Sequence, residues 1–145
     1  MEKPTGVRLK KWKIIEDKNI ADVLVVVYGK TKNALLNNLL EVFGFIISEI
    51  EKIKLRKKIT FKIKGKSFSE QVFLLIEKLI FFKDTKHLIF KKGRFVFEKK
   101  SIKVVLFGQK INNLPIKVDI KALTKHKFKL EKKEGYYRLI LVFDL

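Results

Sequence analysis

The chain has no cysteine and only two histidines among its 145 residues. The absence of cysteine excludes a zinc site built on thiolates, an iron–sulfur cluster, a catalytic thiol and a disulfide framework. His87 and His126 lie far apart in the sequence, which makes a histidine-rich metal site implausible. Because the polar groups left for metal chemistry are carboxylates, the natural candidate is a cation with oxygen ligands, calcium or magnesium.

Long apolar runs and familiar catalytic motifs are also missing. No stretch approaches the roughly 18 apolar residues that a membrane span needs, and residues 1–6 lack the apolar stretch of a secretory signal. We therefore expect a soluble, cytoplasmic protein without membrane association. Glycine-rich phosphate loops, a Gly-x-Ser-x-Gly turn and a His-x-x-x-His pair are absent too. With no nucleophile and base in a recognisable pattern, the sequence predicts a protein that is not an enzyme.

Positive charge, in contrast, is abundant: 34 Lys and Arg residues against 15 Asp and Glu residues give a net charge of +19. A basic surface attracts phosphate backbones through the release of counterions, so we expect at least weak, salt-sensitive contact with RNA or tRNA. The alternative is a compositional bias, in which lysines spread along every segment lie on solvated faces. The sequence leaves both interpretations open.

The apolar pattern predicts a single α+β domain over residues 1–145, with largely antiparallel or mixed β-sheet and two amphipathic helices. The helices are expected at 31–50, capped by Thr31, and at 67–84, opened by a Ser67-Phe-Ser-Glu70 capping box. Strands are expected at 11–16, 22–28, 53–64, 88–90, 94–97, 103–107, 116–131 and 137–145. Lys92-Gly93 and Glu134-Gly135 are expected at hairpin turns, and a bulge is expected within the long strand 116–131.

Two aspartates form the candidate site. Asp22 opens a strongly β-branched strand, and Asp144 closes the last strand of the chain. If these strands are adjacent and antiparallel, both carboxylates lie at one rim of the sheet. Two carboxylates a few Å apart repel, so a metal ion or a lysine is needed to neutralise them. The simpler alternative is a pair of solvated acids at strand ends.

Several segments of the chain are similar to motifs of one known protein family. Ala-Asp followed by five apolar residues and Tyr-Gly-Lys-Thr, at 21–31, is similar to the family's N-terminal signature. Lys-Ala-Leu-Thr-Lys-His at 121–126 resembles its Lys-Ala-Val-Thr-Tyr-His segment, and Leu-Val-Phe-Asp-Leu at 141–145 resembles its closing Val-Ile-Phe-Asp-Ile. Residues 74–90 resemble its second helix and the strand that follows. The similarity covers nearly the whole chain in the right order, and the family that the chain resembles is the archease family.

The resemblance implies a function. Archeases are small non-catalytic activators of the RNA-splicing ligase that joins tRNA exons in a GTP- and metal-dependent reaction. They promote guanylylation of the ligase and allow it to turn over repeatedly. By resemblance, Asp22 and Asp144 match the family's metal-coordinating acids, whereas Lys121 and His126 match motif positions near the functional end. The competing hypothesis is a stand-alone basic RNA-binding domain.

The chain also departs from the family pattern. His-Thr before Ala-Asp is replaced by Asn19-Ile20, and Gly-Glu after a hairpin strand is replaced by Gly108-Gln109. The acidic position of the second helix is Lys78, with Glu77 beside it able to restore the carboxylate only in a different register. The replacements at Lys78 and Gln109 remove acids near the expected metal site, where a lysine could supply part of the cation's charge.

The strand pattern sets expectations for the two other motif residues. His126 shares the predicted apolar face of its strand with Phe128 and Leu130, which favours a buried core histidine over a metal ligand. Lys121 falls on the opposite, polar face and is expected to be solvated.

Overall fold

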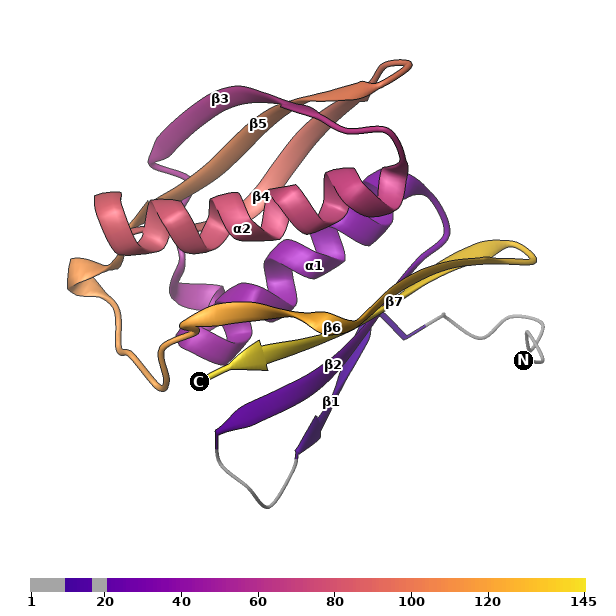
Figure 1. Cartoon of the computed structure of the whole chain (residues 1–145). Coiled ribbons are helices and arrows are strands. Elements are labelled where there is room, and N and C mark those ends of the chain that lie inside the picture. Colours follow the sequence, from indigo (N-terminus) through magenta and orange to yellow (C-terminus); the bar gives the residue numbers. More distant parts are fainter. Residues whose placement is uncertain (1–9, 17–20) are drawn as a thin grey trace.

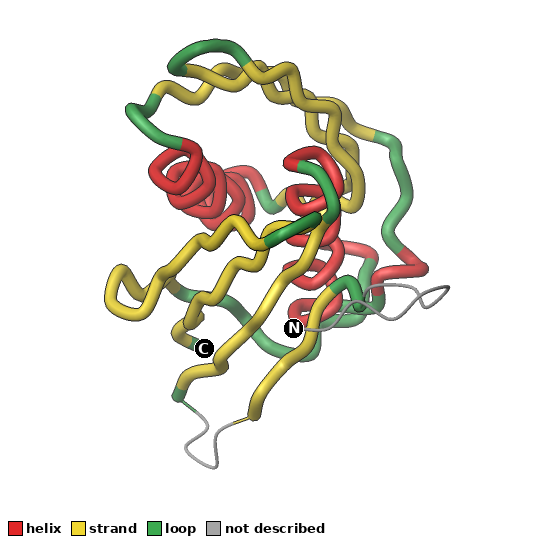
Figure 2. Tube along the Cα trace, turned by 90° about the vertical axis from the view of Figure 1, so that its right-hand side faces the viewer, coloured by secondary structure: helices red, strands yellow, loops and turns green. Residues whose placement is uncertain are grey.

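Two α-helices lie between two antiparallel β-sheets in the computed structural model, which describes residues 10–16 and 21–145 (Figures 1 and 2). The elements are β1 (Trp12–Glu16), β2 (Asp22–Gly29), α1 (Lys32–Ile47), β3 (Lys57–Lys64), α2 (Phe68–Lys86), β4 (Leu88–Phe97), β5 (Ser101–Lys110), β6 (Ala122–Lys133) and β7 (Tyr136–Asp144). The predicted α+β class is confirmed, although the strands form two sheets. Asn19-Ile20 fall outside the described residues. No helix in the described ranges is long and apolar enough to cross a membrane.

The larger sheet has the strand order β1-β2-β7-β6, with β2 in a central position as its composition predicts. Val23, Val25 and Val27 belong to the main core, which both helices and both sheets share. The alternate residues Val26 and Tyr28 pack in a small second cluster with Tyr136. Since successive side chains of a strand point to opposite faces, β2 is buried on both of its faces.

Helix α1 begins at the predicted cap. The Thr31 hydroxyl accepts the N–H of Ala34 at 3.0 Å, and the apolar stripe of the helix is buried. The helix ends at Ile47, three residues before the predicted end, because the chain turns back over it. A Cβ at Gly44 would lie only 2.9 Å from Ile50 Cδ1, so the glycine permits this close return.

Helix α2 also begins as predicted, with the Ser67 hydroxyl accepting the N–H of Glu70 at 3.1 Å. The Glu70 carboxylate accepts the N–H of Lys66 at 2.8 Å, one residue before the position that a capping box requires. The helix continues two residues past the predicted Asp84. His87 then closes it in a left-handed conformation, with φ of 54° and its N–H donated to the Lys83 carbonyl.

The smaller sheet has the order β3-β5-β4 and corrects one predicted turn. Strand β4 runs through Lys92-Gly93, with a register shift between Phe90 and Lys92, and the chain turns at 98–100. Gly93 exchanges two hydrogen bonds with the Asn37 side chain, at 2.8 and 3.1 Å. A Cβ at Gly93 would lie 2.6 Å from the Phe95 ring. This glycine marks close packing of β4 on α1, not a turn.

The predicted strand 116–131 begins only at Ala122. The segment before it is irregular and follows α1, where the Lys117 N–H donates to the Ile47 carbonyl at 2.8 Å. The expected bulge is confirmed, since the register of β6 on β7 shifts between Thr124 and Lys129. The turn at Glu134-Gly135 is confirmed as well, with Gly135 at φ of 82°.

One ion pair on the β6–β7 hairpin gives a pH-dependent prediction. Hydrogen bonds from the Arg138 guanidinium, at 2.6 and 2.8 Å, lower the pKa of the Glu131 carboxyl from 4.5 to about 2. Because the folded-state pKa is depressed, this pair stabilises the fold above the unfolded pKa, and that stabilisation is lost as the pH falls from 4.5 toward about 2. Thermal unfolding of the wild type and of Glu131→Gln across this range should show a wild-type advantage that shrinks and vanishes. A difference in melting temperature that stays constant with pH would contradict it.

Candidate functional site

Asp22 and Asp144 are brought together. Strand β7 lies between β2 and β6, and in the β2–β7 ladder Asp22 and Asp144 are directly opposed partners. Directly opposed residues of antiparallel strands place their Cβ atoms about 4.5–5.5 Å apart on one face of the sheet. The predicted convergence of the two aspartates is therefore confirmed.

The backbone around Asp144 is fixed from both sides. The Asp144 carbonyl accepts the N–H of Lys121 at 2.8 Å, and the next residue, Leu145, donates its N–H to the Ala21 carbonyl at 2.9 Å. The Thr124 hydroxyl donates to the Asp144 carboxylate at 3.4 Å. Neighbouring strands on both sides thus hold the position at which the Asp144 carboxylate leaves the sheet.

The two carboxylates lie on the sheet face that points away from the helices. Val23 and Phe143, the next residues along each strand, belong to the main core, so Asp22 and Asp144 alternate to the opposite face. Asp144 is exposed and Asp22 is partly exposed. Over the described ranges, neither carboxylate forms an ion pair, so no lysine from this part of the chain neutralises them. Both acids are open to solvent to some degree, so water or a cation from outside this part of the chain could screen their repulsion.

Lys121 and His126 have different surroundings. Lys121 is exposed, as expected, and its backbone bond to Asp144 places it beside the aspartate pair. The expectation of a buried His126 is wrong: its side chain is exposed. The cause is the bulge, because His126 lies in the part of β6 where pairing with β7 is interrupted and the alternation of faces is lost.

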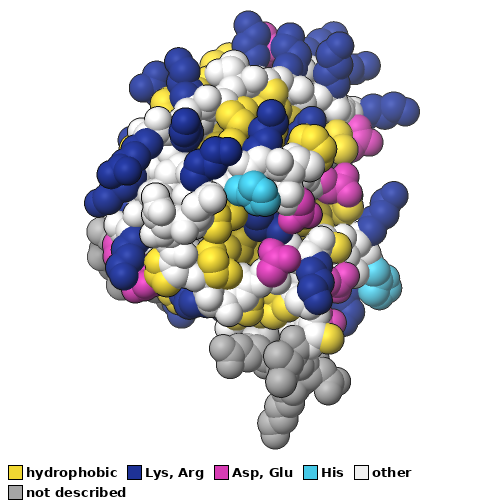
Figure 3. All heavy atoms as spheres, turned by 90° about the vertical axis from the view of Figure 1, so that its left-hand side faces the viewer, with side chains coloured by type: hydrophobic (Ala, Val, Ile, Leu, Met, Phe, Trp, Pro, Cys, Tyr) yellow, Lys and Arg dark blue, Asp and Glu magenta, His cyan; other side chains and the backbone are white. Residues whose placement is uncertain are grey.

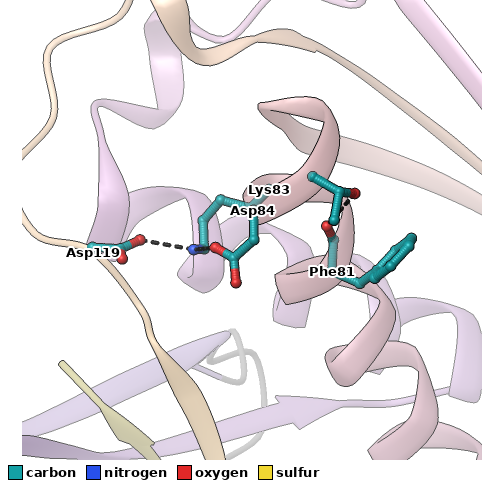
Figure 4. A network of polar contacts seen from close by, with 5 residues as sticks. Phe81, Lys83, Asp84 and Asp119 are labelled. Atoms are coloured by element: carbon teal, nitrogen blue, oxygen red, sulfur yellow. Dashed lines mark hydrogen bonds and ion pairs between the residues drawn. The ribbon is translucent and has the colours of Figure 1, made fainter.

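A buried lysine nearby was not singled out by the sequence. Lys83, near the end of α2, is 5% exposed, and its ammonium group binds the carboxylates of Asp84 and, at 2.7 Å, Asp119 (Figure 4). Asp119 belongs to the irregular segment that leads to Lys121 and β6. Lys83 therefore attaches this segment to α2, on the helix side of the sheet. The sequence does indicate this burial, because Lys83 lies three residues after Ile80 and therefore falls on the apolar stripe of α2.

The two residues that stand at acidic positions of the family pattern have different surroundings. Gln109 is buried; its side-chain oxygen accepts the Lys54 N–H at 2.6 Å and its amide donates to the Lys110 carbonyl. Lys78 is exposed, with its ammonium 5.3 Å from the centre of the Phe81 ring. Glu77 is exposed on the same continuous helix, so no change of register moves it into the place of Lys78.

The described residues form no closed metal site. Within 10–16 and 21–145, no group of three or more His, Cys, Asp and Glu residues could hold a metal ion. Calcium takes six to eight oxygen ligands, more than the two aspartates supply. Magnesium commonly binds one or two carboxylates together with waters and phosphate oxygens. The donor set of Asp22 and Asp144 therefore fits magnesium shared with a phosphate ligand better than calcium in a protein cage.

Figure 3 views the end of the molecule that carries the C-terminal end of α2, the segment before β6 and the end of β7, and acidic side chains gather on this face. The fold and the residues at this end of the molecule define the class of protein. It is a small α+β protein with two carboxylates at one rim of its larger sheet and, in the residues described, no cluster that resembles a metalloenzyme centre.

The chain belongs to the archease family, because residues 12–145 match the model of the Archease protein family (MTH1598/TM1083). It is 25% identical over 126 residues to protein archease of Thermoplasma volcanium, covering 86% of this chain and 93% of that protein. It is 24% identical over 141 residues to protein archease of Sulfurisphaera tokodaii, covering 94% and 100%.

Solved structures share the fold. The solution structure of Methanobacterium thermoautotrophicum protein 1598 superposes with a TM-score of 0.73 at 13% identity, covering 94% of this chain and 100% of that one. The crystal structure of an archease from Thermotoga maritima, described as a possible chaperone, has a TM-score of 0.63 at 19% identity, covering 90% and 96%. At these identities the likeness concerns the fold alone.

Proposed function

We propose that this protein is an accessory protein that activates a GTP-dependent RNA-splicing ligase, promoting its guanylylation and its multiple turnover. The observation that carries the proposal is the pairing of Asp22 with Asp144 at one rim of the larger sheet. Membership of the archease family supports it. Asp144 is exposed and Asp22 is partly exposed. Because no ion pair within the described part of the chain neutralises either carboxylate, both are available to a partner.

The chain's own contribution is to hold two negative charges close together at an accessible edge. The β2–β7 ladder fixes their spacing, and the hydrogen bond from Lys121 fixes the strand end that carries Asp144. Asp22 and Asp144 would hold a divalent ion, and their two carboxylates suit magnesium better than calcium. The ion would supply positive charge to triphosphate oxygens. Docking of this rim on the ligase would order the groups that receive GTP without any bond being broken by this protein.

The test uses purified ligase, GTP and magnesium, with this protein added below the ligase concentration. We expect faster guanylylation of the ligase and more than one ligation cycle per ligase molecule, because a non-catalytic activator is released and acts again. Guanylylation and turnover that stay at the rate of the ligase alone would overturn the proposal.

A stand-alone RNA-binding role remains the second candidate, favoured by the high positive charge. It predicts RNA binding without the ligase and no effect on guanylylation. The two functions are compatible in one molecule if they use different surfaces.

A further inference from the structure

A pocket at the other end of β2 from Asp22 combines lysines with aromatic rings. It has a volume of about 440 Å³ and is lined by residues of the β2–α1 connection, the end of β4 and the β6–β7 hairpin. Its rim carries Lys30, Lys32, Lys132 and Lys133, and Phe97 and Tyr137 contribute to its walls. We refer to it as the lysine pocket.

No carboxylate lines the lysine pocket, whereas three further pockets of the described structure include Glu70 or Glu77. Among the described residues, Lys30, Lys32 and Lys132 form no ion pair. Lys133 lies 3.5 Å from Glu131, but that carboxylate also binds Lys129 and Arg138. Four ammonium groups around one cavity, with little compensation from carboxylates, create a positive potential that favours an anion.

The aromatic walls make the lysine pocket suitable for a nucleotide and not only for a phosphate. The Lys32 ammonium lies 5.6 Å from the centre of the Phe97 ring, and the Lys132 ammonium lies 5.8 Å from that of Tyr137. Both rings are partly exposed. Sites for single-stranded nucleic acids combine these two elements, lysines along the phosphates and aromatic rings on which bases stack.

We propose that the lysine pocket binds single-stranded RNA, with a base against Phe97 and Tyr137 and the flanking phosphates on the four lysines. Lys30 of the pocket lies eight positions after Asp22 along extended β2, roughly 25 Å at about 3.3 Å per residue. The site is therefore distinct from the aspartate pair. The choice of RNA over single-stranded DNA rests on the proposed function, whereas the preference for a nucleic acid follows from the pocket itself.

The test is fluorescence anisotropy of a short labelled single-stranded RNA with this protein alone. The variant Lys30→Glu/Lys132→Glu changes two exposed pocket lysines, and Lys57→Glu/Lys58→Glu makes the same charge change at the exposed start of β3. We expect the pocket variant to bind at least tenfold more weakly than this control. We also expect the slope of log affinity against log salt to fall by about 1.4, since each phosphate contact contributes about 0.7 for a single strand.

Phe97→Leu tests the stacking. It should weaken RNA binding about fivefold or more with an unchanged salt slope, because base stacking on an aromatic ring is lost while the lysines remain. The melting temperature of each variant establishes that it is folded. Unchanged affinity of folded Phe97→Leu would overturn the role of the ring.

Three outcomes would overturn the site or its ligand. Equal losses in the two lysine variants would show that only overall charge matters. Affinity for a polyglutamate of the same charge equal to that for the RNA would assign the pocket to an acidic polypeptide. Tighter binding of single-stranded DNA of the same sequence would exclude RNA as the preferred ligand. The ligase is absent from these RNA-binding measurements. A failure of the pocket proposal would therefore not contradict the proposed function, which the guanylylation test examines separately.

Discussion

Asp144→Asn is expected to reduce ligase guanylylation to the rate of the ligase alone while leaving the fold intact. Asparagine keeps the size of the side chain and an oxygen for the Thr124 hydroxyl, so only the charge is removed. Asp22→Asn should have the same effect. Because the two acids act as one unit, the double variant should lose no more than either single variant.

Stability should move in the opposite direction from activity. Asp22 and Asp144 are directly opposed like charges, which destabilise an antiparallel pair, so either substitution should raise the free energy of unfolding by about 0.2–1 kcal/mol. Glu134→Gln, which removes one acid in the exposed β6–β7 turn, is the matched control and should activate normally. Full activation by the folded Asp22→Asn/Asp144→Asn variant would remove the aspartate pair from the mechanism.

The largest effect on stability is expected from Asp84→Asn/Asp119→Asn. This variant leaves the buried Lys83 ammonium without a carboxylate. Breaking a buried ion pair by removal of one side costs about 3–5 kcal/mol. Asp84 and Asp119 are themselves more than half exposed, at 53% and 57%, so we expect a loss near the lower limit, about 3 kcal/mol.

Urea unfolding of the wild type, the two single variants, the double variant and a triple variant measures this effect. Each single variant should lose less than the double variant, because Lys83 keeps one partner. Adding Lys83→Met to the double variant should recover most of the loss, since a methionine can be buried without a partner. A double variant as stable as the wild type, or a triple variant no more stable than the double, would show that the Lys83 contacts contribute little.

Features that depend on local pattern could be predicted from the sequence. The cap at Thr31 and the turn at Glu134-Gly135 follow from residue types within a few positions. The meeting of Asp22 and Asp144 could also be predicted, because it needed only that two recognisable strands be adjacent and antiparallel.

Features that depend on distant contacts could not. Lys83 is buried because Asp119, 36 residues away, reaches it, and a lysine on a helix is otherwise expected in solvent. Gly93 suggested a turn, but its role is to accept close packing by Asn37, a residue of another element. His126 was misplaced because the pattern predicts a bulge in the strand but not its position.

The free edges of the two sheets account for some of the chain's many lysines. Strands β3 and β6 are edge strands, and both carry lysine at most of their exposed positions. An edge strand offers unpaired backbone groups to any second chain, and lysines along it oppose such pairing by repulsion and by their strong hydration. We therefore expect part of the positive charge to oppose self-association into larger sheets, so that a drop in solubility would accompany broad neutralisation of β3 and β6 even where no ligand is lost.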